Sequence, residues 1–424
     1  MLVNEKPELR RALGGFTYYP NTFSFGTSTN YGSPGLYGGY EYTPEAMNAR
    51  SDKTLGEKHD EALKLMPVLF DEAGYEVTVC DPTFAGYTWI PDLGVFDDHP
   101  DIHTYVTNGR YQVEGLENYS RTAQAEASYR RNLFCYALFK AAPTVLQPTL
   151  YNGGDYNAAN AFALSQTREG LSKSTGVDGT FMDTYAVLDN LPQITDITDT
   201  DQGTFLMMSN DTAHTPTLLS EPDYVPALNV DNTAFDAAHE VRADAQGKPA
   251  TLGNDSQMTH YHVNMAALLK LGEWFDYLRE QGVYDNTRIV IVSDHAWTLG
   301  QNEDLIKEID SSQRVGESRC DLSAFNCMLL VKDFDSKAFK TDDKLMSNAD
   351  TPTLALEGIV DDPINPFTGN KVERIEKDGV EHHVVVATYY NPLDNNGNVF
   401  KEGDWFSVHD NVLDGDNWKY LGSY

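Results

Sequence analysis

The sequence has few basic residues and no long apolar run. Lys and Arg together number 31 against 64 Asp and Glu residues, which gives a formal net charge of −33 at pH 7. A surface of this sign repels phosphate groups. The charge therefore argues against nucleic acid as a partner, and against direct adsorption to anionic lipid unless cations intervene. No run of about 18 apolar residues exists, and the first residues lack the apolar segment of a signal peptide. As written, the sequence predicts a soluble chain.

The sequence has only four cysteines and no CxxC pair, which argues against a zinc site built from cysteines. Cys80 and Cys135 lie in apolar runs and are predicted to be small buried side chains. Cys320 and Cys327 are close enough in sequence to form a disulfide. A disulfide and two free thiols both stay open at this stage.

The sequence does contain enough apolar residues for a large core, since 41% of its residues are hydrophobic and 11% aromatic. Apolar residues recur at helical spacing in residues 58–73, 121–141 and 256–281. Glycines that can end a helix, Gly74 and Gly282, follow the first and the third of these segments. The sequence therefore predicts three substantial helices.

Five short runs have the composition of β-strands. They are residues 75–81, 204–209, 286–295, 325–334 and 382–390. TFLMMS at 204–209 and the IVIV core of 286–295 are continuously apolar, which predicts strands buried on both faces. Helices that alternate with such strands predict an α/β fold, an α/β/α sandwich around a mostly parallel central sheet. We expect residues 1–335 to form this core and residues 336–424 to form a smaller C-terminal subdomain that contains β-strands.

Polar residues follow one of these predicted strands at its carboxyl end, where open α/β sheets bind ligands. Asp294 and His295 come directly after the apolar core of residues 286–295, so a carboxylate and an imidazole can reach one metal ion. These ligand types suit zinc or manganese. The alternative, from the residues alone, is a helix N-cap aspartate beside a surface histidine.

Two other loops carry polar residues that could serve the same site. His214 follows the predicted strand at 204–209. It could bind a phosphate or sulfate oxygen or a second metal, or make a structural hydrogen bond. The segment GTSTNYGSPG at 26–35 could bring backbone N–H groups and a nucleophilic hydroxyl to an anion, or be an ordinary turn before a short helix. His260 and His262, at the start of the third helix, are expected to be solvated or to line the cleft.

The segment YLREQGVYDNTRIVIVSDHA (277–296) resembles the sulfatase segment that ends in Ser-Asp-His-Gly, with Ala296 in place of the glycine. Together with the two loops, it makes the sequence similar to the alkaline phosphatase and sulfatase superfamily. Residues 26–35 resemble the nucleophile loop of the lipid A phosphoethanolamine transferases, and Ala213-His214-Thr215-Pro216 resembles another loop of those enzymes. The lipoteichoic acid synthases share the same plan, with one manganese or zinc ion.

This resemblance implies the roles of the site residues. Thr29 is implied to be the nucleophile that takes up the phosphoryl group, and also to be a metal ligand beside Asp294 and His295. His214 is implied to act in catalysis by binding the phosphate or the metal. One divalent cation, zinc or manganese, is the implied cofactor.

The sequence also departs from the superfamily pattern. The nearest string to the sulfatase motif C/S-x-P-x-R is Gly32-Ser33-Pro34-Gly35, which lacks the arginine and argues against formylglycine chemistry. No strand with a terminal acidic metal ligand precedes Thr29. We expect that strand, and a membrane anchor before it, to lie outside this sequence. Residues 296–310 contain no histidine, which favours a single-metal site.

The resemblance implies a metal-dependent phosphoryl-group transferase or hydrolase, acting on a phospholipid- or glycan-linked phosphodiester through a phospho-threonine intermediate. We expect His214, Asn30 and Trp297 to contact that substrate, although the indole of Trp297 could instead fill the core. Two alternatives stay open: a phosphodiesterase, phosphatase or sulfatase-type hydrolase with water as acceptor, and a degenerate, non-catalytic binding domain. We expect a monomer, which acts at the extracellular face of the cell membrane if the missing anchor exists.

Overall fold

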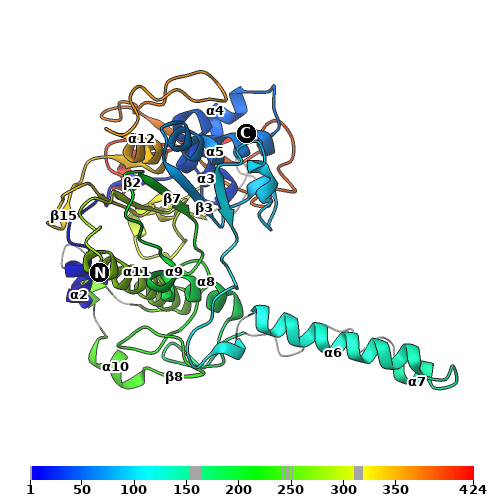
Figure 1. The fold of residues 1–424 in the computed structure, drawn as a ribbon. Coiled ribbons are helices and arrows are strands. Elements are labelled where there is room, and N and C mark those ends of the chain that lie inside the picture. The colour runs from blue at the N-terminus through cyan, green and yellow to red at the C-terminus, as the bar shows by residue number, and fades with distance from the viewer. Residues whose placement is uncertain are drawn as a thin grey trace. The chain divides into compact units, whose positions relative to one another are not determined.

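The computed structural model describes residues 2–119, 121–151, 165–240, 242–243, 249–250, 252–309 and 319–424. The chain forms two compact units, each built from separated segments (Figure 1). Unit 1 contains Met1–Ala12, Thr107–Ile197 and Asn210–Leu278, and unit 2 contains Leu13–Val106, Thr198–Ser209 and Arg279–Tyr424. Residues 336–424 are part of unit 2, and their predicted separation as a subdomain stays a prediction.

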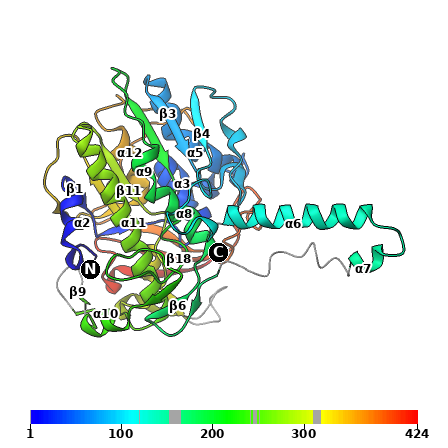
Figure 2. The ribbon, with the colours of Figure 1, turned by 60° about the horizontal axis from the view of Figure 1, so that its bottom comes forward.

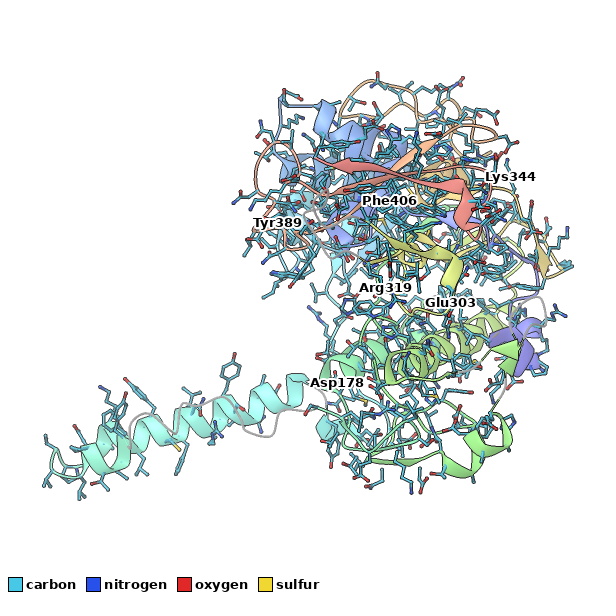
Figure 3. The ribbon with its side chains drawn as sticks, turned by 180° about the vertical axis from the view of Figure 1, so that it is seen from behind. Asp178, Glu303, Arg319, Lys344, Tyr389 and Phe406 are labelled. Carbon is cyan, nitrogen blue, oxygen red and sulfur yellow. The ribbon has the colours of Figure 1, made fainter. Side chains whose placement is uncertain are left out.

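Unit 1 is mainly helical (Figure 2). Its helices are α1 (Leu2–Glu5), α2 (Pro7–Ala12), α6 (Arg121–Ala141), α7 (Gln147–Tyr151), α8 (Gly179–Asp189), α9 (Leu191–Ile194), α10 (Thr233–Ala238) and α11 (Asp255–Glu280). Its short strands pair antiparallel as β5 (Thr167–Arg168), β6 (Lys173–Thr175) and β8 (Asn229–Asp231), and as β9 (Arg242–Ala243) with β10 (Pro249–Ala250). Asp178, labelled in Figure 3, caps α8 by accepting hydrogen bonds from the backbone N–H groups of Thr180 and Phe181.

The 26-residue helix α11 confirms the prediction for residues 256–281. Met265, Leu268 and Phe275 are buried, and their spacing of three to seven residues places them on one face. The helix ends at Glu280, and Gly282 follows with a φ of 76°, a conformation that glycine adopts without strain. The helix predicted at residues 121–141 is likewise confirmed as α6.

Among its described residues, unit 2 contains one four-stranded sheet, two three-stranded sheets and two two-stranded sheets. One three-stranded sheet has the parallel strands β4 (Ile102–Tyr105), β3 (Glu76–Cys80) and β7 (Thr204–Met208), in that order. The four-stranded sheet has the order β11 (Ile289–Val292), β14 (Leu329–Lys332), β1 (Phe16–Tyr18) and β15 (Lys340–Thr341), with β14 antiparallel to both neighbours. The other three-stranded sheet is β17 (His382–Val386) with β18 (Asp404–Val408) and β19 (Trp418–Ser423), and the two-stranded sheets are β2 (Thr22–Phe23) with β16 (Met346–Ser347) and β12 (Ile306–Glu308) with β13 (Arg319–Asp321). The helices are α3 (Thr29–Gly38), α4 (Pro44–Ala49), α5 (Leu55–Glu72) and α12 (Thr351–Leu356).

The predicted α/β class with parallel strands is confirmed, and antiparallel strands accompany them. The prediction that two strands are buried on both faces is wrong. Most side chains of β7 and all those of β11 are partly exposed, and Leu206 of β7 is 46% exposed. Each strand lies at the edge of its sheet, so among the described residues one side of it has no neighbouring strand.

A helix followed by a strand forms much of the core of unit 2. The capping box of Thr54 and Glu57 starts α5, and Gly74, with a φ of 85°, follows its end. β3 comes next, so the predictions for residues 58–73 and 75–81 are confirmed. Buried apolar side chains of α5 and β3 belong to one core cluster with Tyr31 and Tyr37 of α3.

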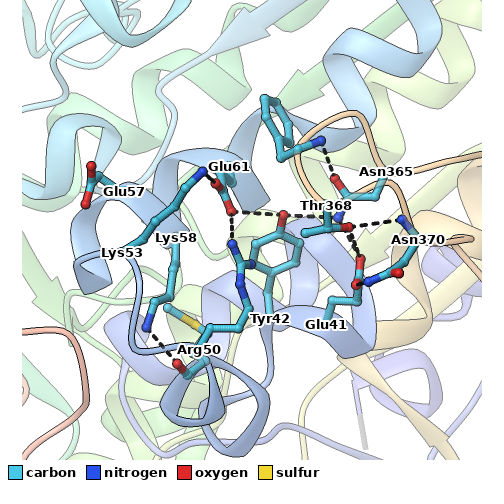
Figure 4. Close-up of polar contacts among 12 residues, drawn as sticks. Glu41, Tyr42, Arg50, Lys53, Glu57, Lys58, Glu61, Asn365, Thr368 and Asn370 are labelled. Carbon is cyan, nitrogen blue, oxygen red and sulfur yellow. Dashed lines mark hydrogen bonds and ion pairs between the residues drawn. The ribbon is translucent and has the colours of Figure 1, made fainter.

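The helix α5 also carries buried polar groups, which the preceding segment satisfies (Figure 4). Glu61 is only 5% exposed and pairs with Arg50 at 2.8 Å and with Lys53. Nζ of the buried Lys58 donates to the carbonyl oxygen of Met47 at 2.7 Å. Removing one partner of a fully buried ion pair costs about 3–5 kcal/mol, and the cost is smaller here because Arg50 and Lys53 are 23% and 39% exposed. These contacts therefore hold the segment between α3 and α5 in place.

All four cysteines are free, so the alternative of a disulfide between Cys320 and Cys327 is excluded in this structure. Cys320 and Cys327 are buried, whereas Cys80 and Cys135 are partly exposed. The prediction that Cys80 and Cys135 are buried is therefore wrong. Cys80 is the last residue of β3, and Cys135 lies on α6, a helix with few buried side chains.

Candidate active site

Thr29 is the first residue of the ten-residue helix α3, and it is partly exposed. Ser28 precedes it in an extended conformation, with a φ of −146° and a ψ of 157°. The predicted loop at 26–35 is therefore a turn of only a few residues, and the helix begins at the proposed nucleophile. A helix N-terminus carries unpaired N–H groups and partial positive charge, which favour a negatively charged ligand beside the Thr29 hydroxyl.

The segment before α3 is held by the end of β17 and the residue that follows it. The N–H group of Val385 donates to the carbonyl oxygen of Phe25 at 3.1 Å, and Gly26 forms a parallel bridge with Val385. The N–H group of Ala387 donates to Oγ1 of Thr27 at 3.2 Å. The start of α3 is thus fixed from both sides of Thr29, by its own helix and by this segment.

Asp294 and His295 follow β11, with side chains that are 29% and 13% exposed. The backbone N–H group of His295 donates to Oδ1 of Asp294 at 2.9 Å. Nδ1 of His295 lies 2.8 Å from the carbonyl oxygen of Ala296, which assigns the ring proton to Nδ1 and leaves Nε2 as an acceptor. Nε2 then lies 3.6 Å from Oδ2 of Asp294.

This spacing suits two ligands of one metal ion. Tetrahedral ligands about 2.1 Å from a zinc ion lie roughly 3.4 Å from one another. A histidine ligand also typically donates its other ring N–H to a carbonyl or carboxylate, as His295 does to Ala296. Asp294 and His295 therefore fit a divalent cation. Among the described residues, no group of three His, Cys, Asp or Glu side chains could hold a metal ion, so the pair needs a ligand of another kind.

Gly32 brings the first turn of α3 against the loop of Asp294. A Cβ atom added to Gly32 would lie 2.4 Å from the carbonyl oxygen of Asp294, so only glycine allows this approach. The side-chain amide of Asn348, in the 3-10 turn η9 (Asn348–Asp350), donates to the carbonyl oxygens of Gly32 at 3.1 Å and of Asp294 at 3.0 Å. Three segments far apart in sequence thereby meet, and the first turn of the helix that begins at Thr29 packs against the loop of Asp294.

Tyr37 and Cys327 lie within electrostatic reach of Asp294. Burial chiefly raises the pKa of the Tyr37 phenol, and the negative charge of Asp294 raises it further. Burial, followed by the same charge, raises the pKa of the Cys327 thiol far above its ordinary value. The hydroxyl of Tyr37 also contacts Oγ of Ser209, just after β7, at 2.9 Å. Tyr37 is not among the residues predicted from the sequence, although its position two turns after Thr29 on the same helix is a signal for it.

His214 belongs to unit 1, and its predicted role at the site stays a prediction. Its side chain is exposed, on a loop where its N–H group donates to the carbonyl oxygen of Asp211 at 2.9 Å. His260 of α11 is buried. Burial lowers the pKa of His260, and the charge of nearby His214 lowers it further. A pair of histidines therefore gathers here, one exposed and one buried.

The expectation that His260 and His262 are solvated is wrong. His260 is 4% exposed and His262 is fully buried. Nδ1 of His262 accepts a hydrogen bond from the N–H group of Leu219 at 3.0 Å, and its Nε2 lies 3.4 Å from Oε1 of Glu221. His262 thus holds the chain that follows the His214 loop.

Three further residues of unit 2 bear on the predicted site. Asn30 is fully buried and donates to the carbonyl oxygen of Tyr389 at 3.4 Å, while its contact with substrate stays a prediction. Trp297 is 42% exposed, which excludes the alternative that it fills the core. Ser33 is buried with its Oγ 3.4 Å from Nε2 of His59, so the residue nearest to a sulfatase nucleophile in sequence is not open to solvent.

No family model matches this sequence, and no curated protein matches it. Solved structures match it in fold. The structure of Ps i-CgsB in complex with k-i-k-neocarrahexaose has a TM-score of 0.52 and 14% identity, over 95% of this chain and 76% of that chain. A phosphonate monoester hydrolase from Silicibacter pomeroyi has a TM-score of 0.45 and 14% identity, over 98% and 83%. An alkaline phosphatase superfamily protein from Vibrio parahaemolyticus has a TM-score of 0.44 and 13% identity, over 98% and 72%.

Proposed function

Because the chain has the fold of the alkaline phosphatase superfamily, as its motifs predict, we propose that it is a metal-dependent enzyme that breaks phosphate esters. The observation that carries the proposal is the contact between Gly32 of α3 and the carbonyl oxygen of Asp294. This contact supports a site in which the Thr29 hydroxyl, one turn before Gly32, acts together with Asp294 and His295. In this proposal Thr29 is the nucleophile, the N-terminus of α3 binds the anion, and Asp294 and His295 are metal ligands.

The site residues suit a single divalent cation. Asp294 Oδ2, His295 Nε2 and the Thr29 hydroxyl would hold it, and zinc and manganese both suit these ligands. The bound cation would lower the pKa of the Thr29 hydroxyl and offset negative charge on the phosphate. The hydrogen bond from Nδ1 of His295 to the carbonyl oxygen of Ala296 keeps the ring oriented and leaves Nε2 as the ring nitrogen for a cation.

The proposed reaction has two steps. The deprotonated Thr29 oxygen attacks phosphorus in line, the bond from phosphorus to the leaving alcohol breaks, and that alcohol takes up a proton. The N-terminus of α3 stabilises the equatorial oxygens during this step. Water, or a second alcohol, then attacks the phospho-threonine, loses its proton, and releases Thr29. His214 is proposed to stabilise the phosphoryl oxygens or the leaving group.

The finer proposal is a phosphoryl-group transferase that acts on a phospholipid- or glycan-linked phosphodiester. It is supported by the match between GTSTNYGSPG and the nucleophile loop of phosphoethanolamine transferases, and by the missing arginine of the sulfatase motif. The exposed indole of Trp297, close in sequence to His295, offers an apolar face to a glycerol or sugar. Such a substrate would place the enzyme at the outer face of the cell membrane.

The test compares Thr29→Ala with Thr29→Ser on a bis-aryl phosphate, an aryl phosphate, an aryl sulfate and an aryl phosphonate. We expect Thr29→Ala to lose at least about 10³-fold in kcat, and Thr29→Ser to keep measurable activity because it keeps the hydroxyl. Thermal melts of both variants check the fold. Full activity of Thr29→Ala on every ester would overturn the nucleophile. A marked preference for the sulfate would overturn phosphate as the substrate.

A second candidate function is a binding domain with a degenerate metal site. It is favoured by the observation that Asp294 and His295 have no third His, Cys, Asp or Glu partner among the described residues. Metal analysis of the protein after dialysis against zinc and manganese separates the two. Binding of about one equivalent of metal by the unchanged protein, and of none by Asp294→Ala, supports the enzyme. No bound metal at any pH between about 6 and 9, together with no turnover, supports the binding domain.

A further inference from the structure

The helices α6 and α7 form a hairpin with few contacts to the rest of unit 1. In Figures 1 and 2 their ribbon extends away from α8 and α11 of the same unit. The hairpin is closed by local contacts. The side-chain amide of Gln147 donates to the carbonyl oxygen of Ala142 at 3.1 Å, and the rings of Phe139 and Tyr151 lie 5.6 Å apart.

This hairpin exposes large apolar side chains. Leu133 and Phe134 are each 70% exposed, and Val145 is 82% exposed. The exposed apolar residues of the hairpin are Tyr129, Leu133, Phe134, Tyr136, Leu138, Val145, Leu146, Leu150 and Tyr151. Figure 3 shows side chains projecting from its ribbon. A single exposed apolar residue needs no explanation, but a continuous set of this size marks an interaction surface.

The positions of these residues show which kind of partner fits. On a helix, the consecutive residues Leu133, Phe134, Cys135 and Tyr136 each turn about 100° from the one before, so apolar side chains lie on all sides of the end of α6. A protein groove covers one stripe of a helix, whereas hydrocarbon covers all sides. The nine residues from Leu133 to Ala141 span about 14 Å. That length reaches through the headgroups into one leaflet of a bilayer, whose hydrocarbon core is about 30 Å thick.

The charge of the hairpin differs in sign from that of the whole chain. Residues 121–151 contain Arg121, Arg130, Arg131 and Lys140 and one acidic residue, Glu126, which gives a net charge of +3, within a chain of −33. Arg130 and Arg131 are exposed just before the apolar segment, where they can contact headgroup phosphates. The negative net charge of the whole chain argues against adsorption of its acidic surface to anionic lipid. That argument does not apply to the hairpin, because the hairpin itself is positively charged.

We propose that the α6–α7 hairpin inserts into one leaflet of a lipid bilayer that contains anionic lipid. Arg130 and Arg131 stay at the phosphates. The side chains that enter the acyl region are those of Leu133, Phe134, Leu138, Val145, Leu146 and Leu150. Tyr129 and Tyr136 suit the interface, because a tyrosine has an apolar ring and a polar end. Among the described residues, no helix is long and apolar enough to cross a membrane. The proposal is therefore that the hairpin enters one leaflet and does not span the bilayer.

The test is flotation of the full chain with vesicles of phosphatidylcholine that contain 30% phosphatidylglycerol, and with phosphatidylcholine alone. We compare the unchanged protein with Leu133→Ser/Phe134→Ser/Leu138→Ser, with Arg130→Glu/Arg131→Glu, and with Ile90→Ser. Ile90 is 82% exposed but lies in unit 2, so it controls for the loss of an exposed apolar side chain. All changed residues are exposed, and melting curves check that each variant folds.

We expect the triple variant to lose at least about tenfold in vesicle partitioning, because three apolar side chains no longer leave water. The charge reversal should lose about tenfold on the anionic vesicles and little on phosphatidylcholine. Ile90→Ser should float like the unchanged protein. A dye on Cys135 of α6 should shift its emission to the blue with vesicles. Equal flotation of the triple variant and the unchanged protein would overturn the proposal. The proposal would also be overturned if the unchanged protein did not float but formed a dimer without vesicles, and the triple variant were a monomer. The hairpin would then pair with a second copy of the chain.

Discussion

The side-chain amide nitrogen of Asn348 lies 3.0 Å from the carbonyl oxygen of Asp294, across 54 residues of sequence. The same nitrogen lies 3.1 Å from the carbonyl oxygen of Gly32, 316 residues away. One buried amide therefore ties the helix that begins at Thr29 to the loop that carries Asp294 and His295. We therefore propose that Asn348 is a positioning residue, which acts on the site through the two segments that it joins.

We expect Asn348→Ala to weaken metal binding by about 10–100-fold, because residues that orient metal ligands have effects of this size. The free energy of unfolding should fall by about 1–3 kcal/mol, since two buried carbonyl groups lose their donor. Titration with zinc and urea unfolding measure the two effects. The matched control is Asn326→Ala, because Asn326 also donates to two carbonyl oxygens, those of Pro20 and Thr22. Equal loss of metal affinity in both variants would contradict the positioning role.

Gly32 and Gly35 of α3 give a second matched pair. A methyl group at Gly32 would collide with the carbonyl oxygen of Asp294 at 2.4 Å, whereas at Gly35 its nearest neighbour is Cβ of Ala349 at 3.7 Å. We expect Gly32→Ala to reduce kcat/KM by at least about 100-fold, because the approach of Thr29 to the metal ligands is displaced. Gly35→Ala should leave the fold intact and raise helix stability by about 0.5–1 kcal/mol. Kinetics and thermal melts check both, and an active Gly32→Ala variant would contradict the close approach.

The acceptor of the second step is open to a direct measurement. With an aryl phosphodiester substrate, added glycerol or ethanolamine competes with water for the phospho-threonine. If the enzyme is a transferase, we expect an alkyl phosphate product to grow with the concentration of added alcohol, while release of the first aryl alcohol stays constant. Phosphorus NMR detects both products. Free phosphate ester alone, at every alcohol concentration, would identify a hydrolase.

The four cysteines should differ in reactivity by their surroundings. Burial chiefly raises the pKa of the Cys80 thiol, to about 11, and that of Cys327 is raised further, so at pH 8 both are almost entirely protonated and slow to alkylate. Cys135 is partly exposed on α6 and should react first. Reaction of Cys80 should speed up as the pH rises towards 11, because its thiolate fraction grows.

Mass spectrometry after iodoacetamide treatment measures this order. In urea without reductant, we expect four adducts, because all four thiols are free. Two adducts in urea would instead reveal a disulfide between Cys320 and Cys327 and would contradict the structure.

The sequence predicts the local elements well. The periods of residues 121–141 and 256–281 identify α6 and α11, and the apolar run before Asp294 identifies β11. Those signals depend only on residues that are close together in the sequence, as does the adjacency of Asp294 and His295. The partial exposure of β7 and β11 could not be predicted, because it depends on which strands pair beside them. The role of Asn348 is non-local in the same way, since its acceptors lie 54 and 316 residues away.

The division of the chain into interleaved units has a consequence for its synthesis. The segments of unit 1 are all present once Leu278 has been made, so unit 1 can close early. Unit 2 cannot, because β1 pairs with β14, where Phe16 lies opposite Lys332. At 5–20 residues per second, the ribosome needs roughly 15–60 seconds to supply that partner. Through that interval β1 has neither of its described partner strands, β14 and β15, so its backbone N–H and C=O groups stay unpaired in the nascent chain.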